Sequence, residues 1–188
     1  DNIGPIVGRE LKIKSIQAVI ILLVVIIVYI SLVFRAMSRV LSPWALGIAA
    51  VFALIHDVII PMGVFSILGT YYGVEISAVF VAAALTILGY SVSDTVVVFD
   101  RVRENVIRYG SKESFVSLMH KSILQTLTRS INTSVTTLLS LLAIFFFGGE
   151  TIKYFALALI IGIISGTYSS IFVASPIVVW WHERRKRA

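Results

Sequence analysis

Long apolar runs, separated by short polar segments, make up most of this chain. An α-helix needs about 20 apolar residues to cross the roughly 30 Å hydrocarbon core of a bilayer. Pro61 lies inside the second run, where its missing N–H should kink a helix. The last run is longer than a bilayer requires and should tilt. We therefore predict five transmembrane helices, at about 15–34, 43–68, 76–99, 123–147 and 152–181.

Three polar segments complete the predicted architecture: a stub at 1–14, a connector at 100–122 and a basic tail at 182–188. The connector has helical periodicity. Residues 101–109 are predicted to extend the third span as an amphipathic surface helix, and a second short helix should follow along the membrane surface. Gly110 should end the first helix in the left-handed conformation, and Ser111 should cap the second. Their apolar faces would carry Val102, Val106, Tyr109, Phe115, Leu118 and Met119. We thus predict an all-α integral membrane protein with five transmembrane helices and a short amphipathic cytoplasmic segment.

Composition and charge agree with this prediction. Of the 188 residues, 58% are hydrophobic, which exceeds the about 45–50% of soluble domains. The net charge of +6 does not indicate nucleic-acid binding, because the basic residues gather at the ends of the apolar runs. Arg35, Arg39, the connector and the tail place most of them on one side, which the positive-inside rule assigns to the cytoplasm. The stub is then predicted outside and the C-terminus inside.

Motifs for enzymatic chemistry are absent from the sequence. It has no cysteine, and therefore no disulfide and no thiolate metal site. It also lacks a phosphate-binding P-loop, an HExxH zinc motif and a Gly-x-Ser-x-Gly nucleophile, and its three His residues are scattered. We expect no enzymatic activity, no metal and no organic cofactor.

One carboxylate, that of Asp94, lies inside an apolar run. It is about 9 Å along a helix from Asp100, the next charge. A charge in hydrocarbon is unfavourable by several kcal/mol unless it is paired or hydrated, and intramembrane carboxylates commonly mark ion or proton paths. Asp is also short, so it reaches the membrane surface less easily than Lys or Arg. We therefore predict a functional role for Asp94.

The fourth run carries Arg129 at a similar depth, roughly 12 Å along the helix from Lys121. We predict that it pairs with Asp94, with snorkelling to the membrane surface as the alternative. A polar stripe follows it on one helical face. The stripe consists of Asn132, Thr133, Thr136 and Ser140. It predicts a hydrated path, unless its hydroxyls only bond to the backbone or join helices.

Other polar residues could extend this path. Ser91 and Ser93 flank Asp94, and the second run contains the ionisable pair His56 and Asp57. The pair has two interpretations: it belongs to the path, or it forms structural hydrogen bonds beside the expected kink. Polar groups in lipid must be satisfied in either case.

Small residues gather on one face of the fifth run, with a four-residue spacing that favours close helix packing. The face contains Gly162, Ser165, Gly166, Ser169, Ser170 and Ala174. We expect it to have no chemical role.

Four segments resemble motifs of the SecD/SecF family of protein-export membrane proteins, and specifically of its SecF members. They are 53–58 (ALIHDV), 89–105 (GYSVSDTVVVFDRVREN), 126–134 (TLTRSINTS) and 162–171 (GIISGTYSSI). The resemblance covers the chain from about residue 3 to its end. The Gly-Tyr-Ser pattern at 89–91 distinguishes these members from their SecD paralogues. The family is similar to the resistance-nodulation-division (RND) superfamily.

The resemblance implies a proton-driven subunit that acts with SecD and the SecY-SecE-SecG translocon in late steps of protein export. The protein would lie in the cytoplasmic membrane of a bacterium or archaeon. It would contact membrane lipids and would not bind nucleic acid. Protons would be the coupling ion. Asp94 matches the family's proton-linked aspartate and Arg129 its partner arginine.

The family has six helices and an external domain between the first two. The resemblance therefore implies that this chain lacks the first helix and that domain, which would contact the exported precursor. The stub is similar to the strand that leaves the domain.

Two other functions remain open. The chain could be a passive scaffold in which Asp94 and Arg129 only lock helices together, or a small-molecule or lipid exporter of the same superfamily. Dependence of the activity on protons would distinguish the export function from the passive scaffold. The long SecF-like motifs count against the exporter.

Overall fold

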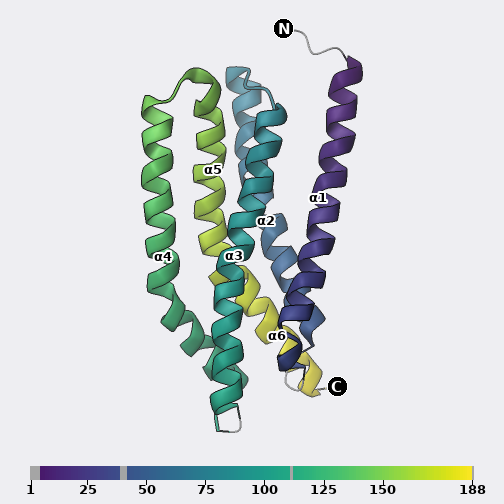
Figure 1. Cartoon of the computed structure of the whole chain (residues 1–188), viewed down its shortest axis with the longest axis vertical. Coiled ribbons are helices and arrows are strands. Elements are labelled where there is room, and N and C mark those ends of the chain that lie inside the picture. The colour runs from purple at the N-terminus through teal and green to yellow at the C-terminus, as the bar shows by residue number, and fades with distance from the viewer. Residues whose placement is uncertain (1–4, 39–41, 111, 188) are drawn as a thin grey trace.

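Helices account for the regular structure of the described residues, which are 5–38, 42–110 and 112–187 of a computed structural model, and no strand occurs among them. The six α-helices are α1 (Pro5–Val33), α2 (Pro43–Tyr72), α3 (Ala78–Tyr109), α4 (Phe115–Phe147), α5 (Glu150–Ser169) and α6 (Ser175–Arg187) (Figure 1). A 3-10 turn (Arg35–Met37) follows α1, and a π-helical segment, η2 (Ser170–Ala174), joins α5 to α6.

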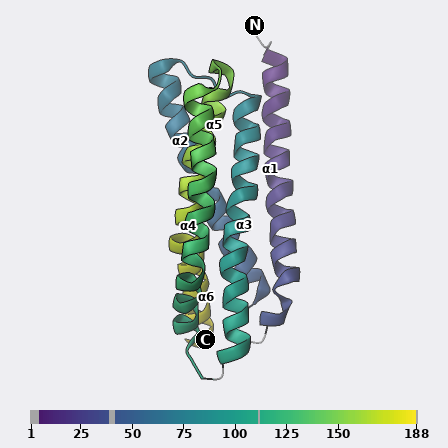
Figure 2. The same cartoon turned by 60° about the vertical axis from the view of Figure 1, so that its left-hand side comes forward.

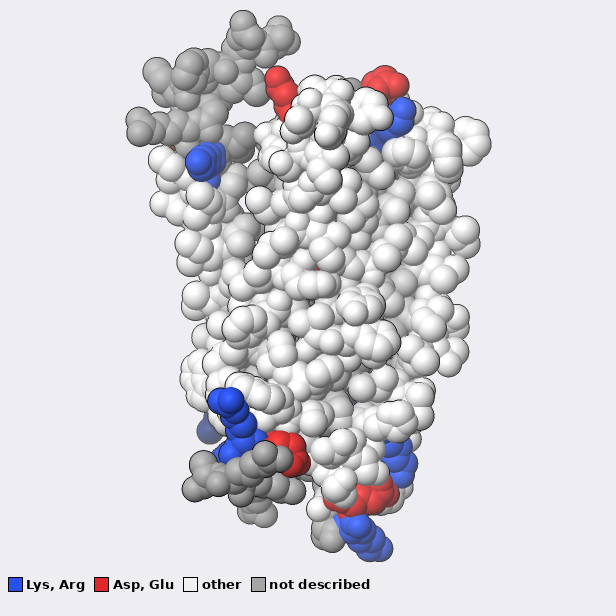
Figure 3. All heavy atoms as spheres, turned by 180° about the vertical axis from the view of Figure 1, so that it is seen from behind, with Lys and Arg blue, Asp and Glu red and all other residues white. Residues whose placement is uncertain are grey.

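Within the described part of the chain, five helical stretches are long and apolar enough to cross a membrane: Lys12–Val33, Pro43–Tyr72, Ala78–Tyr109, Phe115–Phe147 and Ile152–Arg185. The last combines α5, η2 and α6. On the face seen in Figure 3, charged side chains lie near the two ends of the molecule, with a broad and almost uncharged band between them. The predicted all-α protein with five transmembrane helices is confirmed.

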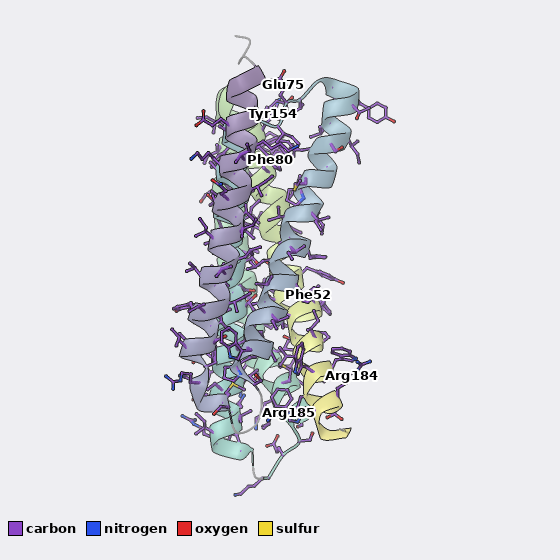
Figure 4. All side chains as sticks on the ribbon, turned by 90° about the vertical axis from the view of Figure 1, so that its right-hand side faces the viewer. Phe52, Glu75, Phe80, Tyr154, Arg184 and Arg185 are labelled. Atoms are coloured by element: carbon purple, nitrogen blue, oxygen red, sulfur yellow. The ribbon has the colours of Figure 1, made fainter. Side chains whose placement is uncertain are left out.

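The helices run side by side along the long axis of the molecule. In Figure 1, α1 lies at one edge and α4 at the other, while α5 packs against α2, α3 and α4. The turned view in Figure 2 shows the same bundle with α3 between α1 and α4. Glu75, Phe80 and Tyr154 lie near one end of the bundle, and Arg184 and Arg185 lie near the other (Figure 4).

Two apolar cores stabilise the bundle. One includes Phe34, Phe99 and Leu118, and the other includes Phe65 and Ile87, all of them buried. The buried carboxylate described below lies between them along α2, because Asp57 follows Leu54 of the first core and precedes Phe65 of the second.

The face of α5 that carries the small residues packs closely against α3, as predicted. A Cβ atom at Gly162 would overlap side-chain carbons of Ile87, and one at Gly166 would lie 3.0 Å from Cβ of Ser91. Glycine at these two positions therefore lets the two backbones approach.

The π-helical segment η2 interrupts the fifth membrane-spanning stretch. Pro176, just beyond it, has no N–H to donate to the helical ladder. A π-helical turn accommodates such a break and occurs frequently at functional sites. The helix axis changes direction at this point, and α6 runs obliquely to α5 in Figure 1.

The connector between α3 and α4 differs in part from its prediction. Residues 101–109 extend α3, as predicted, but Gly110 is right-handed, with φ −62°. Ser114 caps α4 by accepting a hydrogen bond from the Ser117 N–H, while Ser111 is outside the described residues. Most of the apolar face is buried in the first apolar core of the bundle. Its buried members are Val102, Val106, Phe115, Leu118 and Met119.

The N-terminal stub also differs from its prediction. From Pro5 onward its backbone is helical and continuous with the first membrane-spanning stretch. The likeness of this segment to a strand is therefore wrong for the described residues.

Candidate functional site: two carboxylates held by serine hydroxyls

Asp94 lies on α3, partly buried against α4 and η2. The hydroxyl of Ser170, the first residue of η2, donates to Asp94 Oδ2 at 2.6 Å. The hydroxyl of Ser130 on α4 donates to Oδ1. Both serines are buried. The carboxylate thus connects three elements of the bundle through neutral donors.

The predicted ion pair between Asp94 and Arg129 is not formed among the described residues. The reason is rotational: Ser130 faces Asp94, and its neighbour Arg129 points about 100° away around α4. Arg129 is exposed on the single chain, and the two residues meet only as lining of a common cavity.

Two neighbouring cavities lie along α3, one beside Asp94 and the other beside Asp100. The first, of about 70 Å³, is lined by Tyr90, Ser93, Asp94, Val97, Arg129 and Thr133. A polar cavity needs only about 15 Å³ to hold one water molecule. The second, of about 220 Å³, is lined by residues that include Asp100 and Gln125. Arg129 and Val97 line both cavities and so stand between them.

Asp57 on α2 is the second carboxylate, and it is completely buried. Its Oδ2 accepts hydrogen bonds from Ser91 at 2.5 Å and Ser169 at 2.7 Å, and its Oδ1 accepts one from Ser165 at 3.1 Å. Nδ1 of His56 lies 3.0 Å from the same Oδ1. These contacts occupy the roughly four acceptor positions of a carboxylate.

The polar residues predicted to form one path are therefore divided between the two carboxylates. Ser91 bonds to Asp57 rather than to Asp94, whereas Ser93 is exposed and lines the Asp94 cavity. The structural interpretation of Asp57 is supported by its three serine donors. Its place in a proton path stays a prediction.

The polar stripe of α4 lies on the outside of the single chain, where Asn132, Thr133 and Thr136 are exposed. The Thr133 and Thr136 hydroxyls donate to the carbonyls of Arg129 and Asn132, at 2.9 Å and 3.0 Å. Backbone bonding, the alternative considered for these hydroxyls, thus occurs. Their role in a hydrated path also stays a prediction.

Five serines bond to the two carboxylates among the described residues, and only Ser91 was predicted to take part in the site. The other four are Ser130, Ser165, Ser169 and Ser170. Three of them belong to the small-residue face of α5 and η2, which therefore donates hydrogen bonds to both carboxylates in addition to packing. The expectation that this face has no chemical role stays a prediction. A signal was available, because buried carboxylates require donors and this face offers three hydroxyls. Among the described residues, no three His, Cys, Asp or Glu side chains gather where they could hold a metal ion.

The chain matches the family model described as "Protein export membrane protein SecD/SecF, C-terminal" over residues 1–184. A relative from Thermobaculum terrenum, "Protein translocase subunit SecF", is 53% identical over 184 residues, which cover 97% of this chain and 56% of the relative. "Protein translocase subunit SecDF" from Thermus thermophilus is 43% identical over 188 residues, which cover 99% of this chain and 24% of the relative.

A solved structure, "Crystal structure of SecDF in Super-membrane-facing form", matches with a TM-score of 0.82 and 42% sequence identity. The match covers 98% of this chain and 23% of that chain. This chain spans about half the length of the SecF relatives it matches.

Proposed function

The chain belongs to the SecD/SecF family of protein-export membrane proteins, and we propose that it couples proton movement through the membrane to late steps of protein export. It acts as part of a SecF subunit together with SecD, as the fused relative named SecDF supports. The proposed location is the cytoplasmic membrane, with the N-terminal segment outside and the C-terminus in the cytoplasm.

The observation that carries the proposal is the setting of Asp94. Its oxygens accept hydrogen bonds from two serine hydroxyls, and no described cation pairs with it. An unpaired carboxylate inside a membrane is unfavourable, and taking up a proton removes its charge. The cavity beside it has room for the water through which a proton would arrive. Asp94 is therefore the proposed proton carrier.

Arg129 has a different role in this proposal from that of a permanent partner. It separates the cavity beside Asp94 from the one that reaches Asp100. A fixed positive charge there opposes free passage of cations. When Asp94 is ionised, the same charge favours movement of Arg129 toward it. Arg129 thus controls access between Asp94 and the end of the bundle.

SecD is the proposed partner at the outer face of α4. Arg129, Asn132 and Thr133 are exposed on the single chain at membrane depth. Polar and charged side chains in membrane helices face a bundle interior or a hydrated cavity rather than lipid. A second membrane subunit on this face would provide that interior. The SecY-SecE-SecG translocon and the exported precursor are the further proposed partners, reached through parts of the protein beyond this chain.

The test is export in cells whose only SecF is the full-length protein carrying Asp94→Asn. Asn keeps the shape of the side chain but cannot carry the proton, so secretion should fall to the level of cells without SecF. Glu104→Gln on the same helix is the matched control, because Glu104 lines neither cavity and pairs only with Arg101 and Arg108, at 2.6 Å and 2.8 Å, among the described residues. It should secrete normally. Full secretion with Asp94→Asn would favour the passive scaffold.

A further inference from the structure

Asp57 presents a problem of charge that its serine neighbours do not solve. Its side chain is 0% exposed. Hydroxyls stabilise an ionised carboxylate by hydrogen bonding but leave its net charge in place. A buried charge is strongly unfavourable unless it is compensated, and such groups commonly neutralise instead. Some positive charge should therefore accompany Asp57.

The elements packed around Asp57 offer one source of that charge. From α3 it meets Ser91, and from α5 it meets Ser165 and Ser169. Two titratable side chains of α3 lie near Ser91 and bond elsewhere: Tyr90 donates to Ser134, and Asp94, one turn beyond Ser91, accepts from Ser130 and Ser170. Among the described residues, neither Lys nor Arg bonds to Asp57. Its titratable contact is His56, whose ring also stacks on Tyr168 at 6.1 Å.

His56 is suited to deliver a proton to Asp57. Its Nδ1 lies 3.0 Å from Oδ1 of Asp57, while its side chain is 32% exposed. The imidazole therefore contacts the buried oxygen and also reaches the outside of the bundle. A proton on Nδ1 gives an imidazolium–carboxylate pair, and its transfer to Oδ1 gives a neutral pair. Either form neutralises the site with one proton.

The two carboxylates are connected by adjacent residues of the fifth membrane-spanning stretch. Ser169 donates to Asp57 and Ser170 donates to Asp94, at 2.7 Å and 2.6 Å. The π-helical segment begins at Ser170. A protonated carboxyl accepts hydrogen bonds less strongly than a carboxylate, so a change at either Asp loosens one of two neighbouring serines. Because the two serines are adjacent in the chain, the hydrogen bond of the other serine should change as well.

We propose that His56 and Asp57 form a second proton-binding site, coupled to Asp94 through Ser169 and Ser170. The inference deepens the proposed function and rests on it, since both sites would serve the same proton-driven movement. It assigns to the π-helical segment the role of transmitting protonation from one carboxylate to the other.

Infrared difference spectroscopy of the full-length protein in complex with SecD tests the site. The carboxyl C=O band reports protonation directly, as pH is varied over the range in which the complex stays assembled. Asp94→Asn/Asp57→Asn should lose one titrating carboxyl band that Asp94→Asn retains, and the difference between the two variants assigns this band to Asp57. His56→Gln should shift its midpoint. If Asp57→Asn does not assemble, Ser91→Ala, which removes one donor from Asp57, should shift the same band.

The outcomes separate this inference from the proposed function. A titrating Asp94 band without an Asp57 band would overturn the second site and leave the proposed function standing. A titrating Asp57 band without a titrating Asp94 band would contradict the proposed function instead. A band at Asp57 that responds to added Na⁺ but not to pH would overturn the proton as its ligand.

The coupling has its own test with matched serines. Asp94→Asn should shift the midpoint of the Asp57 band, and Ser170→Ala should remove that dependence. Ser165→Ala is the control, because it removes a hydroxyl from Asp57 but leaves both bonds of the Ser169–Ser170 connection. If Asp94→Asn shifts the midpoint of the Asp57 band equally in the Ser170→Ala and wild-type backgrounds, the coupling is overturned.

Discussion

Ser169 and Ser170, neighbours where α5 passes into the π-helical segment, donate hydrogen bonds to two different carboxylates, Asp57 and Asp94. One carboxylate is on α2 and the other is on α3. A single peptide unit thus connects two acidic groups that are far apart in the sequence. This connection makes the fifth membrane-spanning stretch a structural partner of both candidate sites.

The hydrogen bond between Ser130 and Asp94 should stabilise the contact of α4 with α3. A hydrogen bond to a charged group contributes about 1.5–3 kcal/mol. We expect Ser130→Ala to lower the free energy of unfolding by an amount in this range at a pH where Asp94 is ionised. In a double-mutant cycle, the effect should shrink when Asp94→Asn is already present.

Ser140→Ala is the control for this cycle, because its exposed hydroxyl bonds only to the carbonyl of Thr136, at 3.3 Å, among the described residues. It should change stability little in either background. Equal effects of Ser130→Ala with and without Asp94 would exclude an energetic link between the two side chains.

Arg129 should contribute more to activity than to stability. It forms no ion pair among the described residues, so Arg129→Gln should change the free energy of unfolding by no more than about 0.5 kcal/mol. Proton flux should nevertheless change, and Arg129→Lys should restore part of it because the positive charge returns. A stability loss of about 3–5 kcal/mol, typical of a broken buried ion pair, would show that Arg129 is paired after all.

Gly162 should not tolerate a side chain. An added Cβ would overlap carbons of Ile87, and overpacking of this kind typically destabilises by about 1–3 kcal/mol. We expect Gly162→Ala to lower the thermal unfolding midpoint, and Ile87→Ala to recover part of the loss in the double variant. Gly63→Ala on α2 is the control, since nothing lies within 4 Å of a Cβ there. Equal midpoints for the two glycine variants would refute the close approach of α5 and α3.

The sequence was sufficient to predict the five membrane-spanning stretches and the isolated carboxylate of Asp94. Both follow from hydropathy, because lipid strongly disfavours charge. It was insufficient for the partners of that carboxylate. Periodicity placed Arg129 at the correct depth, but the choice between Arg129 and Ser130 depends on a rotation of about 100°, which only packing fixes.

The serines of α5 show a second limit. The spacing of Gly162 and Gly166 predicted close packing correctly. The same pattern concealed Ser165, Ser169 and Ser170, because a small residue that permits packing and one that donates a hydrogen bond look alike in sequence. The connector was misjudged for a related reason: an apolar helical face fits a bundle core as well as a membrane surface.

The central claim is that Asp94 carries the coupled proton, and proton flux into vesicles containing the full-length complex with SecD tests it most directly. With an imposed proton gradient, wild type and Glu104→Gln should acidify the vesicle lumen at equal rates. Asp94→Asn should fall to the rate of protein-free vesicles while remaining assembled with SecD. Wild-type flux through assembled Asp94→Asn would contradict the claim.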